Sequence, residues 1–431
     1  MAIVRSPIKP GASGHATGAQ ANMRSLPKKI IAGHTGMVGS TVERRLIAEG
    51  CPASSGDVNV NRPDYFGRRI LSRGEKLLIK FAIVGCGRIA KRHSELLGFS
   101  QITGASLVAV CDVVEERAKE FGERFGVPHY QSIDEMLQNT DADVVSILTP
   151  SGMHAEHVIT AAKYKRHIVV EKPMALTLTD AEAMIKACDD NNIRLFVVKQ
   201  NRFNVPVLKA REALDAGRFG KLVLGTVRVR WCRDQSYYDQ DNWRGTWQYD
   251  GGVLANQASH HIDMLTWFMG DVESVHARAA TALVDIEAED TAVATLKFRN
   301  GALGIIEATA ATRPKDIEGS ISILGAGGSV EIAGFAVNKI RTWQFGDHDL
   351  GDEQVMEKYS VNPPNVYGFG HQAYYEHVVD CLVNDIKAIV DGHEGRQSLE
   401  LISALYESIA SNQEVKLPLE VKHSKLGRSS Q

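Results

Sequence analysis

The feature that most constrains the fold is a glycine-rich turn between a predicted buried strand and a predicted helix. The segment reads Phe81-Ala82-Ile83-Val84-Gly85-Cys86-Gly87-Arg88-Ile89-Ala90. In such a turn Gly85 permits the sharp change of direction, Gly87 lets a pyrophosphate approach the backbone, and Ala90 lets the helix pack closely on the strand. Free amide groups and the positive end of the helix attract phosphate. The turn therefore predicts a doubly wound sheet that binds a dinucleotide.

Strand and helix patterns alternate from Lys80 onward, which predicts a parallel sheet with helices on both faces. The expected strands are 80–84, 106–111, 143–148, 167–171 and 193–198, and the expected helices are 114–125, 153–165 and 179–191. We assign residues 79–200 to an N-terminal Rossmann domain.

After residue 200, apolar residues recur at every second position, which indicates strands that are buried on one face. Alternating segments are 222–231, 291–298, 303–308, 321–324 and 330–332, and Arg299-Asn300-Gly301 is typical of a hairpin. Helices are expected at 205–216, 257–269 and within 368–413. We predict a C-terminal α/β domain with a largely antiparallel open sheet over residues 201–415, followed by a tail, 416–431. One face of such a sheet often meets a second subunit, so a homo-oligomer, dimer or tetramer, is expected.

The first 78 residues differ from the rest of the chain. Residues 1–27 are predicted to be a disordered leader, because they are rich in Gly, Pro and Ala. Residues 28–78 are predicted to be a vestigial Rossmann-like fragment and linker. Within them, residues 29–50 contain G-x-x-G-x-x-G and resemble the start of a GDP-fucose synthase. One strand and one helix cannot form a sheet with a switch point.

Composition excludes several classes of function. With 49 Lys or Arg against 52 Asp or Glu, the net charge of −3 gives no reason to expect a nucleic-acid partner. Six cysteines without a Cys-x-x-Cys pair indicate reduced thiols rather than disulfides or a zinc site. No apolar run reaches eighteen residues, so no membrane span is expected. We expect a cytoplasmic globular protein with no metal.

A carboxylate closes the second predicted strand. Asp112 lies 25 residues after Gly87, close to the ~20 expected for a ribose-binding residue. A carboxylate there accepts hydrogen bonds from the ribose 2′-hydroxyl and repels a 2′-phosphate, so the predicted cofactor is NAD rather than NADP. Cofactor contacts are assigned to the turn and to the ends of the strands: Gly85, Gly87, Arg88, Ile89, Asp112, Thr149, Ser151, His154, Glu171, Lys172 and Gln200.

Two further segments carry groups suited to taking a hydride from a secondary alcohol. They are Glu171-Lys172-Pro173, after a predicted strand, and Gly251–Asp263, which contains Asn256 and His260. Loss of the hydride requires loss of the hydroxyl proton, and the ordinary pKa of histidine suits His260 as the base. Lys172 offers a cation to the alkoxide, or is itself the base if burial lowers its pKa. Asp263, one helical turn after His260, can orient the ring.

Together these motifs resemble the Gfo/Idh/MocA oxidoreductases over residues 80–415. The resemblance implies a Rossmann domain followed by an α/β domain whose open sheet carries subunit contacts. It also implies that Lys172 and His260 are catalytic-site residues, and that Asn256 stands where many members have aspartate. An amide does not titrate, so Asn256 can orient the substrate or His260 but cannot act as a base.

The segment from Arg233 to Trp247 is rich in aromatic residues and arginines, which suits a ring that carries a negatively charged group. Substrate contacts are assigned to Arg202, Tyr238, Trp243, Arg244, Asn256 and His260. This segment and Asn256-Gln257 resemble the nucleotide-sugar 3-dehydrogenases, which implies oxidation at C3 of a UDP-N-acetylhexosamine or its uronic acid. An inositol or simple sugar dehydrogenase, or a non-catalytic regulatory relative, remains an alternative.

Overall fold

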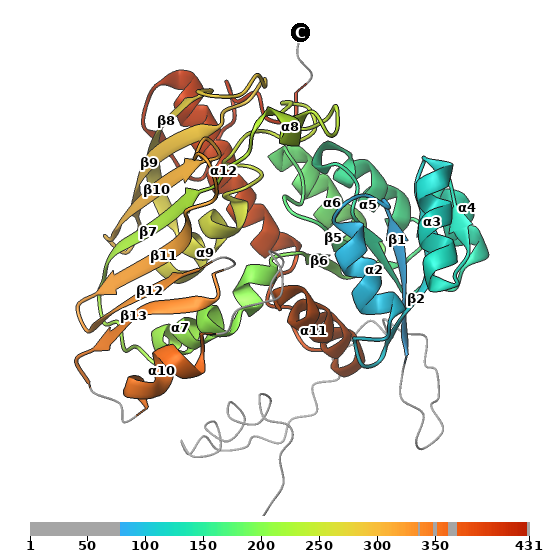
Figure 1. The fold of residues 1–431 in the computed structure, drawn as a ribbon, viewed down its shortest axis with the longest axis horizontal. Coiled ribbons are helices and arrows are strands. Elements are labelled where there is room, and N and C mark those ends of the chain that lie inside the picture. Colours follow the sequence, from blue (N-terminus) through green and yellow to red (C-terminus); the bar gives the residue numbers. More distant parts are fainter. Residues whose placement is uncertain (1–77, 335–336, 348–350, 361–368, 429–431) are drawn as a thin grey trace, which may run out of the picture. The chain divides into compact units, whose positions relative to one another are not determined.

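The computed structural model describes residues 78–334, 337–347, 351–360 and 369–428 (Figure 1). The predicted leader of residues 1–27 lies outside this part of the chain. The predicted fragment and linker of residues 28–78 lie outside it too, except for Leu78, and so does the segment that resembles a GDP-fucose synthase.

The N-terminal sheet has six parallel strands in the order β3-β2-β1-β4-β5-β6. The strands are β1 (Ile79–Val84), β2 (Ala105–Cys111), β3 (His129–Tyr130), β4 (Val144–Ile147), β5 (His167–Val170) and β6 (Leu195–Val197). The helices between them are α2 (Ala90–Gly98), α3 (Glu115–Phe125), α4 (Ile133–Asn139), α5 (His154–Ala162) and α6 (Leu178–Asp190), with a short 3₁₀ turn, η1 (Ser151–Met153). Strands β2 and β3 lie on one side of β1, and strands β4 to β6 lie on its other side. The carboxyl ends of β1 and β4 therefore border the switch point, where ligands bind in such sheets.

Local sequence explains these elements. The central strands β4 and β5 are buried throughout, because helices cover both faces of a parallel sheet. Helix α4 begins after Ser132, whose side chain accepts a hydrogen bond from the Glu135 backbone N–H. Thr177 caps α6 in the same way, because its side chain accepts a hydrogen bond from the Asp180 backbone N–H. Such caps satisfy backbone donors that the first helical turn leaves free.

The C-terminal sheet has eight strands in the order β13-β12-β11-β7-β10-β9-β8-β14. They are β7 (Leu222–Arg230), β8 (Val272–Ala280), β9 (Thr291–Phe298), β10 (Leu303–Thr309), β11 (Glu318–Gly325), β12 (Gly328–Ala333), β13 (Lys339–Phe345) and β14 (Val415–Lys416). All neighbouring pairs are antiparallel except β7 and β10. The prediction of a Rossmann domain followed by a largely antiparallel sheet is confirmed.

Helices lie along one face of this second sheet (Figure 1). The helical elements after β6 are η2 (Gln200–Phe203), α7 (Val205–Asp215), α8 (Gln235–Tyr238), α9 (Ser259–Met269), α10 (Asp352–Lys358), α11 (Gly370–Asn384) and α12 (Gly392–Ser411). Strands β9 and β10 alternate between buried and exposed residues, as a sheet covered on one face does. Their exposed positions include Val293, Leu303 and Ile305. The predicted homo-oligomer stays a prediction.

The segment predicted as a tail is packed where the structure describes it. Its first residue, Lys416, belongs to β14. The carboxylate of Glu407 on α12 accepts hydrogen bonds from the backbone N–H groups of Lys422, His423 and Ser424, and Leu426 is buried. Within the described ranges, every helix is too short or too polar to cross a bilayer.

Candidate active site

A cavity of about 1180 Å³ opens at the carboxyl edge of the parallel sheet. Residues that follow β1, β2, β4 and β5 form one part of its lining, and these include Gly85, Asp112, Thr149 and Lys172. The remainder comes mainly from the segment between Trp231 and His260. The cavity exceeds the ~300–1,000 Å³ of a site for one drug-sized ligand, so it has room for a dinucleotide and a second molecule.

The glycine turn has the geometry that a dinucleotide requires. Gly85 has φ +95°, and a Cβ atom there would lie 2.9 Å from the carbonyl carbon and oxygen of Leu148. A side chain is therefore excluded by both the backbone conformation and the close approach of β4. At Gly87 a Cβ would meet no heavy atom within 4 Å, so open space lies where a phosphate would approach. Arg88 and Ile89, at the start of α2, also line the cavity.

Asp112 is fixed beside this turn. Its Oδ2 accepts a hydrogen bond from the Cys86 N–H at 2.8 Å, and its Oδ1 accepts one from the Val114 N–H at 2.9 Å. The residue is 9% exposed and lines the cavity. Each carboxylate oxygen keeps lone-pair capacity for a ribose hydroxyl, because a carboxylate accepts about four hydrogen bonds. The geometry fits NAD, and it leaves a negative charge where NADP would carry its 2′-phosphate.

His154 joins two cavity loops to each other. Its Nδ1 lies 2.9 Å from the Pro173 carbonyl oxygen and its Nε2 lies 2.8 Å from the Thr149 carbonyl oxygen. Thr149 also hydrogen-bonds His157 through its hydroxyl, at 2.9 Å. His154 lines the cavity together with Ser151, as predicted, but both of its nitrogens face the protein. His154 would therefore support a cofactor indirectly, by holding the loops that contain Thr149 and Pro173.

Lys172 follows β5 and reaches across to the C-terminal domain. Its Nζ donates a hydrogen bond to the Asn256 carbonyl oxygen at 3.0 Å, and its backbone N–H donates to Glu171 Oε2 at 2.9 Å. Burial lowers the pKa of the Lys172 amine, and the charges of Glu171 and Asp250 oppose that shift. A lysine with a lowered pKa is able to take a proton in a reaction.

His260 lies at the start of α9 and also lines the cavity. Its Nε2 shares a hydrogen bond with Gln200 Nε2 at 3.0 Å, while its Nδ1 has no hydrogen-bond partner among the described residues. Burial and the charges of Lys172 and Lys199 hold the pKa of His260 well below its usual range. The expectation of an ordinary histidine pKa is therefore wrong: the ring is neutral at physiological pH. Gln200 lies behind His260 rather than in the cavity lining.

Arg202 and Asp263 belong to a buried network of ion pairs, although the sequence assigned them to the substrate and to His260. Arg202 is 2% exposed and donates to Asp263 from Nε and Nη2, at 2.8 and 2.9 Å. Its Nη1 donates to Glu394 at 2.9 Å, and Lys199 Nζ lies 3.7 Å from Asp263. Arg202 is absent from the cavity lining, so its assignment to the substrate is wrong. Asp263 is turned toward these cations, so it does not orient His260.

In the segment 231–247, Tyr237 rather than Tyr238 faces the cavity. Tyr238 is buried, because neighbouring residues of the short helix α8 point in different directions. The Arg244 guanidinium lies 4.8 Å from the Tyr237 ring centroid and 4.6 Å from that of Trp243. Arg88 of the Rossmann domain lies 5.9 Å from the same tyrosine ring. Trp243 and Arg244 line the cavity as predicted.

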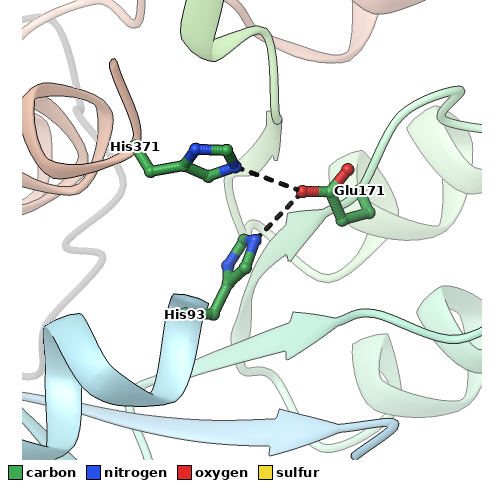
Figure 2. Close-up of side chains that lie close together, drawn as sticks. All are labelled: His93, Glu171 and His371. Carbon is green, nitrogen blue, oxygen red and sulfur yellow. Dashed lines mark hydrogen bonds and ion pairs between the residues drawn. The ribbon is translucent and has the colours of Figure 1, made fainter. Parts of the chain in front are cut away.

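Glu171, the residue before Lys172, belongs to a buried cluster with His93 and His371 (Figure 2). Glu171 Oε1 lies 3.0 Å from His93 Nε2 and 3.8 Å from His371 Nε2. The Nδ1 of His93 hydrogen-bonds the Tyr375 hydroxyl at 2.7 Å. Burial raises the pKa of Glu171, but the contact with His371 and the hydrogen bond with His93 hold this pKa well below its usual range.

No motif in the sequence indicates this cluster. Its ligand-type atoms lie within 4.8 Å of one another, a spacing that metal sites also show. Hydrogen bonds from His93 and from the Lys172 backbone already engage both oxygens of Glu171. Nothing in the spacing of His93, Glu171 and His371 along the chain could have revealed it.

Comparisons with known proteins agree with this geometry. A family model described as the NAD-binding Rossmann fold of the Gfo/Idh/MocA oxidoreductases matches residues 79–199, and one for their C-terminal α/β domain matches residues 211–417. Myo-inositol 2-dehydrogenase of Thermotoga maritima is 30% identical over 353 residues, which cover 79% of this chain and 98% of that protein.

Two solved structures are more similar in sequence. The WlbA dehydrogenase of Bordetella pertussis, in complex with NADH and UDP-GlcNAcA, is 44% identical with a TM-score of 0.76, over 80% of this chain and 99% of that one. The WlbA dehydrogenase of Chromobacterium violaceum, with the same ligands, is 43% identical with a TM-score of 0.76, over 80% and 98%. The matches establish an NAD-dependent oxidoreductase that acts on a sugar hydroxyl. The chain belongs to the Gfo/Idh/MocA oxidoreductase family.

Proposed function

We propose that this protein oxidises the C3 hydroxyl of a UDP-N-acetylhexosamine, or of its uronic acid, with NAD. The observation that carries the proposal is a wall formed by Arg233, Tyr237, Trp243 and Arg244. This wall lines the same cavity as the cofactor turn and Lys172. The solved WlbA structures, which hold NADH and UDP-GlcNAcA, support the same substrate class.

The wall suits a nucleotide sugar chemically. Tyr237 and Trp243 line the cavity, where an aromatic side chain can pack against a sugar or uracil ring. Arg233 and Arg244 each pair with one aspartate, Asp316 and Asp241, at 3.0 Å. Guanidinium groups have five donors, so each arginine keeps donors for a carboxylate or diphosphate.

Arg88 adds a further cation at the start of α2. Within the described part of the chain it forms no ion pair, and it lines the cavity opposite Tyr237. A guanidinium at this place favours negative charge, which the diphosphate of NAD or of a nucleotide sugar would supply.

The reacting groups then take distinct roles. NAD accepts the hydride from the carbinol carbon when it is bound. The hydroxyl proton passes to the Lys172 amine, whose pKa burial lowers, and the alcohol becomes a ketone. His260 is neutral, and its ring lines the cavity beside the substrate hydroxyl. Asn256 contacts the substrate without taking a proton.

A second candidate is an inositol or simple sugar dehydrogenase. The Thermotoga maritima relative, a myo-inositol 2-dehydrogenase at 30% identity, favours it. The two candidates differ in one feature: only the nucleotide sugar uses the arginine and aromatic wall.

The test is to measure NADH formation by absorbance with NAD and each of four compounds. These are UDP-N-acetylglucosaminuronic acid, UDP-N-acetylglucosamine, glucose and myo-inositol, with the Lys172→Ala variant as the blank. We expect NADH from a UDP-sugar and little from the two free compounds. Turnover of myo-inositol without turnover of either UDP-sugar would reject the proposal in favour of the second candidate.

A further inference from the structure

Asp250 is a buried carboxylate beside the reacting groups, and none of the roles above uses it. It is 2% exposed and immediately precedes Gly251. Its Oδ1 accepts a hydrogen bond from Asn256 Nδ2 at 2.6 Å, and its Oδ2 accepts one from the Gly245 N–H at 2.9 Å. No lysine, arginine or histidine of the described ranges forms an ion pair with it. A buried carboxylate without a contacting cation is costly, which points to a use at this place.

Asn256 connects Asp250 to Lys172. The Asn256 carbonyl oxygen accepts the hydrogen bond from Lys172 Nζ, and its side-chain amide donates to Asp250. The NH₂ group of the amide must face the carboxylate, because only that group can donate to it. The amide oxygen is consequently the atom that Asn256 can offer to the cavity, which it lines.

We propose that Asp250 is a positioning residue for the oxidation: it fixes the Asn256 amide with its oxygen toward the substrate, and its negative charge acts on the Lys172 amine. This inference rests on the proposed role of Lys172 as the proton acceptor. Asp250 itself is not part of the cavity lining, so it acts through Asn256 and Lys172.

Several charged groups surround Lys172 and Asp250. The charges that act on Lys172 come from Glu171, Lys199, Arg244 and His260, while Arg244 and Glu289 act on Asp250. Burial raises the pKa of Asp250 to about 6, although its two hydrogen bonds and the Lys172 and Arg244 charges oppose the rise. Asp250 is therefore an anion at neutral pH. Its charge raises the pKa of Lys172 against the lowering by burial.

The test compares Asp250→Asn with wild type across pH. The substitution removes the charge and keeps the shape, so the pKa of Lys172 should fall further. The acid limb of kcat/KM, which reports the deprotonation of the base, should move to lower pH. Asparagine has one acceptor oxygen, which cannot serve both the Gly245 N–H and the Asn256 amide as the two oxygens of Asp250 do. The Asn256 amide is therefore less firmly held, and kcat should fall about tenfold to a hundredfold, while the KM for NAD stays unchanged.

Glu289→Gln is the matched control. Glu289 is also a buried carboxylate, and burial raises its pKa to about 7. Its Oε1 accepts from the Leu254 N–H and the Tyr406 hydroxyl, and it does not contact Asn256. We expect the acid limb of Glu289→Gln to match that of wild type. An equal shift in both variants would overturn the proposal.

A second readout does not depend on the substrate. The pH dependence of acetic anhydride labelling at Lys172, measured by mass spectrometry of its peptide, gives the pKa of the amine. A midpoint that is lower in Asp250→Asn supports the proposal, and an unchanged midpoint overturns it. If wild-type protein oxidises no sugar offered, the proposed function fails, yet the labelling still decides the role of Asp250.

A further variant covers the case in which Asp250→Asn does not fold. Asn256→Ala removes the amide and leaves the Asp250 charge in place. We expect kcat to fall while the acid limb of kcat/KM does not move to lower pH. Full kcat in Asn256→Ala would overturn the positioning role.

Discussion

Replacing Glu171 by glutamine tests whether the buried cluster holds Lys172 in place. The carboxylate accepts the Lys172 backbone N–H through Oε2 at 2.9 Å and contacts His93 through Oε1 at 3.0 Å (Figure 2). Glutamine has the same shape but only one acceptor oxygen and no charge. One hydrogen bond is lost and the other becomes a bond between neutral groups.

The size of the effect follows from these two contacts. A hydrogen bond to a charged group contributes ~1.5–3 kcal/mol, and one between neutral groups contributes ~0.5–1.5 kcal/mol. Losing the first and weakening the second should lower the free energy of unfolding by about 2–4 kcal/mol. Glu171 is almost fully buried, so solvent does not reduce this effect. We also expect kcat to fall about tenfold or more, because the backbone of Lys172 loses its anchor.

The assay is thermal unfolding by differential scanning fluorimetry, together with steady-state NADH formation. Glu182→Gln is the control, since Glu182 is an exposed partner of Arg396 and an exposed ion pair contributes ~0–1 kcal/mol. The same change of side chain should therefore lower Tm clearly at Glu171 and hardly at Glu182.

The pH dependence gives a second check. The pKa of Glu171 in the folded protein lies well below its ordinary value of 4.5, so the stability it contributes is present above about pH 4.5 and is lost as the pH falls toward the folded pKa. The difference in Tm between wild type and Glu171→Gln should be full at neutral pH and shrink only below about pH 4.5. Equal Tm and equal kcat at neutral pH would refute the reasoning.

The remaining predictions concern the groups that line the cavity. Lys172→Ala and His260→Ala should each lower kcat ~10²–10⁴-fold with little change in Tm, as for a positioned proton-transfer or charge-stabilising group; wild-type turnover of either variant would remove that residue from the reaction. Arg244→Ala should raise the KM for the sugar more than it lowers kcat, since the side chain belongs to the wall; a fall in kcat with KM unchanged would contradict this. Because Asp112 places a negative charge at the ribose, kcat/KM with NAD should greatly exceed that with NADP, and equal values would show that the ribose lies elsewhere.

Much of the fold was predictable because its signals are local. Every strand predicted between residues 80 and 198 is present with small shifts at its ends. Strands β3, β8, β13 and β14 were not predicted. In β8, the adjacent polar residues Glu273 and Ser274 break the alternation of apolar and polar residues, and the strand register shifts at the same place.

The site was predictable only in part. Lys172, Asn256 and His260 line one cavity because each sits where a strand or helix end must face the switch point. Arg202 and Tyr238 were assigned by their nearness in sequence to the cleft. In the folded protein, Arg202 donates to the buried carboxylate of Asp263, and Tyr238 is buried in the core.

The sequence by itself determined the turn at Gly85, the carboxylate at Asp112 and the lysine after β5, because each is set by a few neighbouring residues within one strand–turn–helix unit. Only the tertiary structure decided the contact of Glu171 with His371 and that of His260 with Gln200. It also decided the charge states of the reacting groups. The physical reason is that burial and Coulomb interactions sum over every neighbour in space, and those neighbours come from elements far apart in the chain.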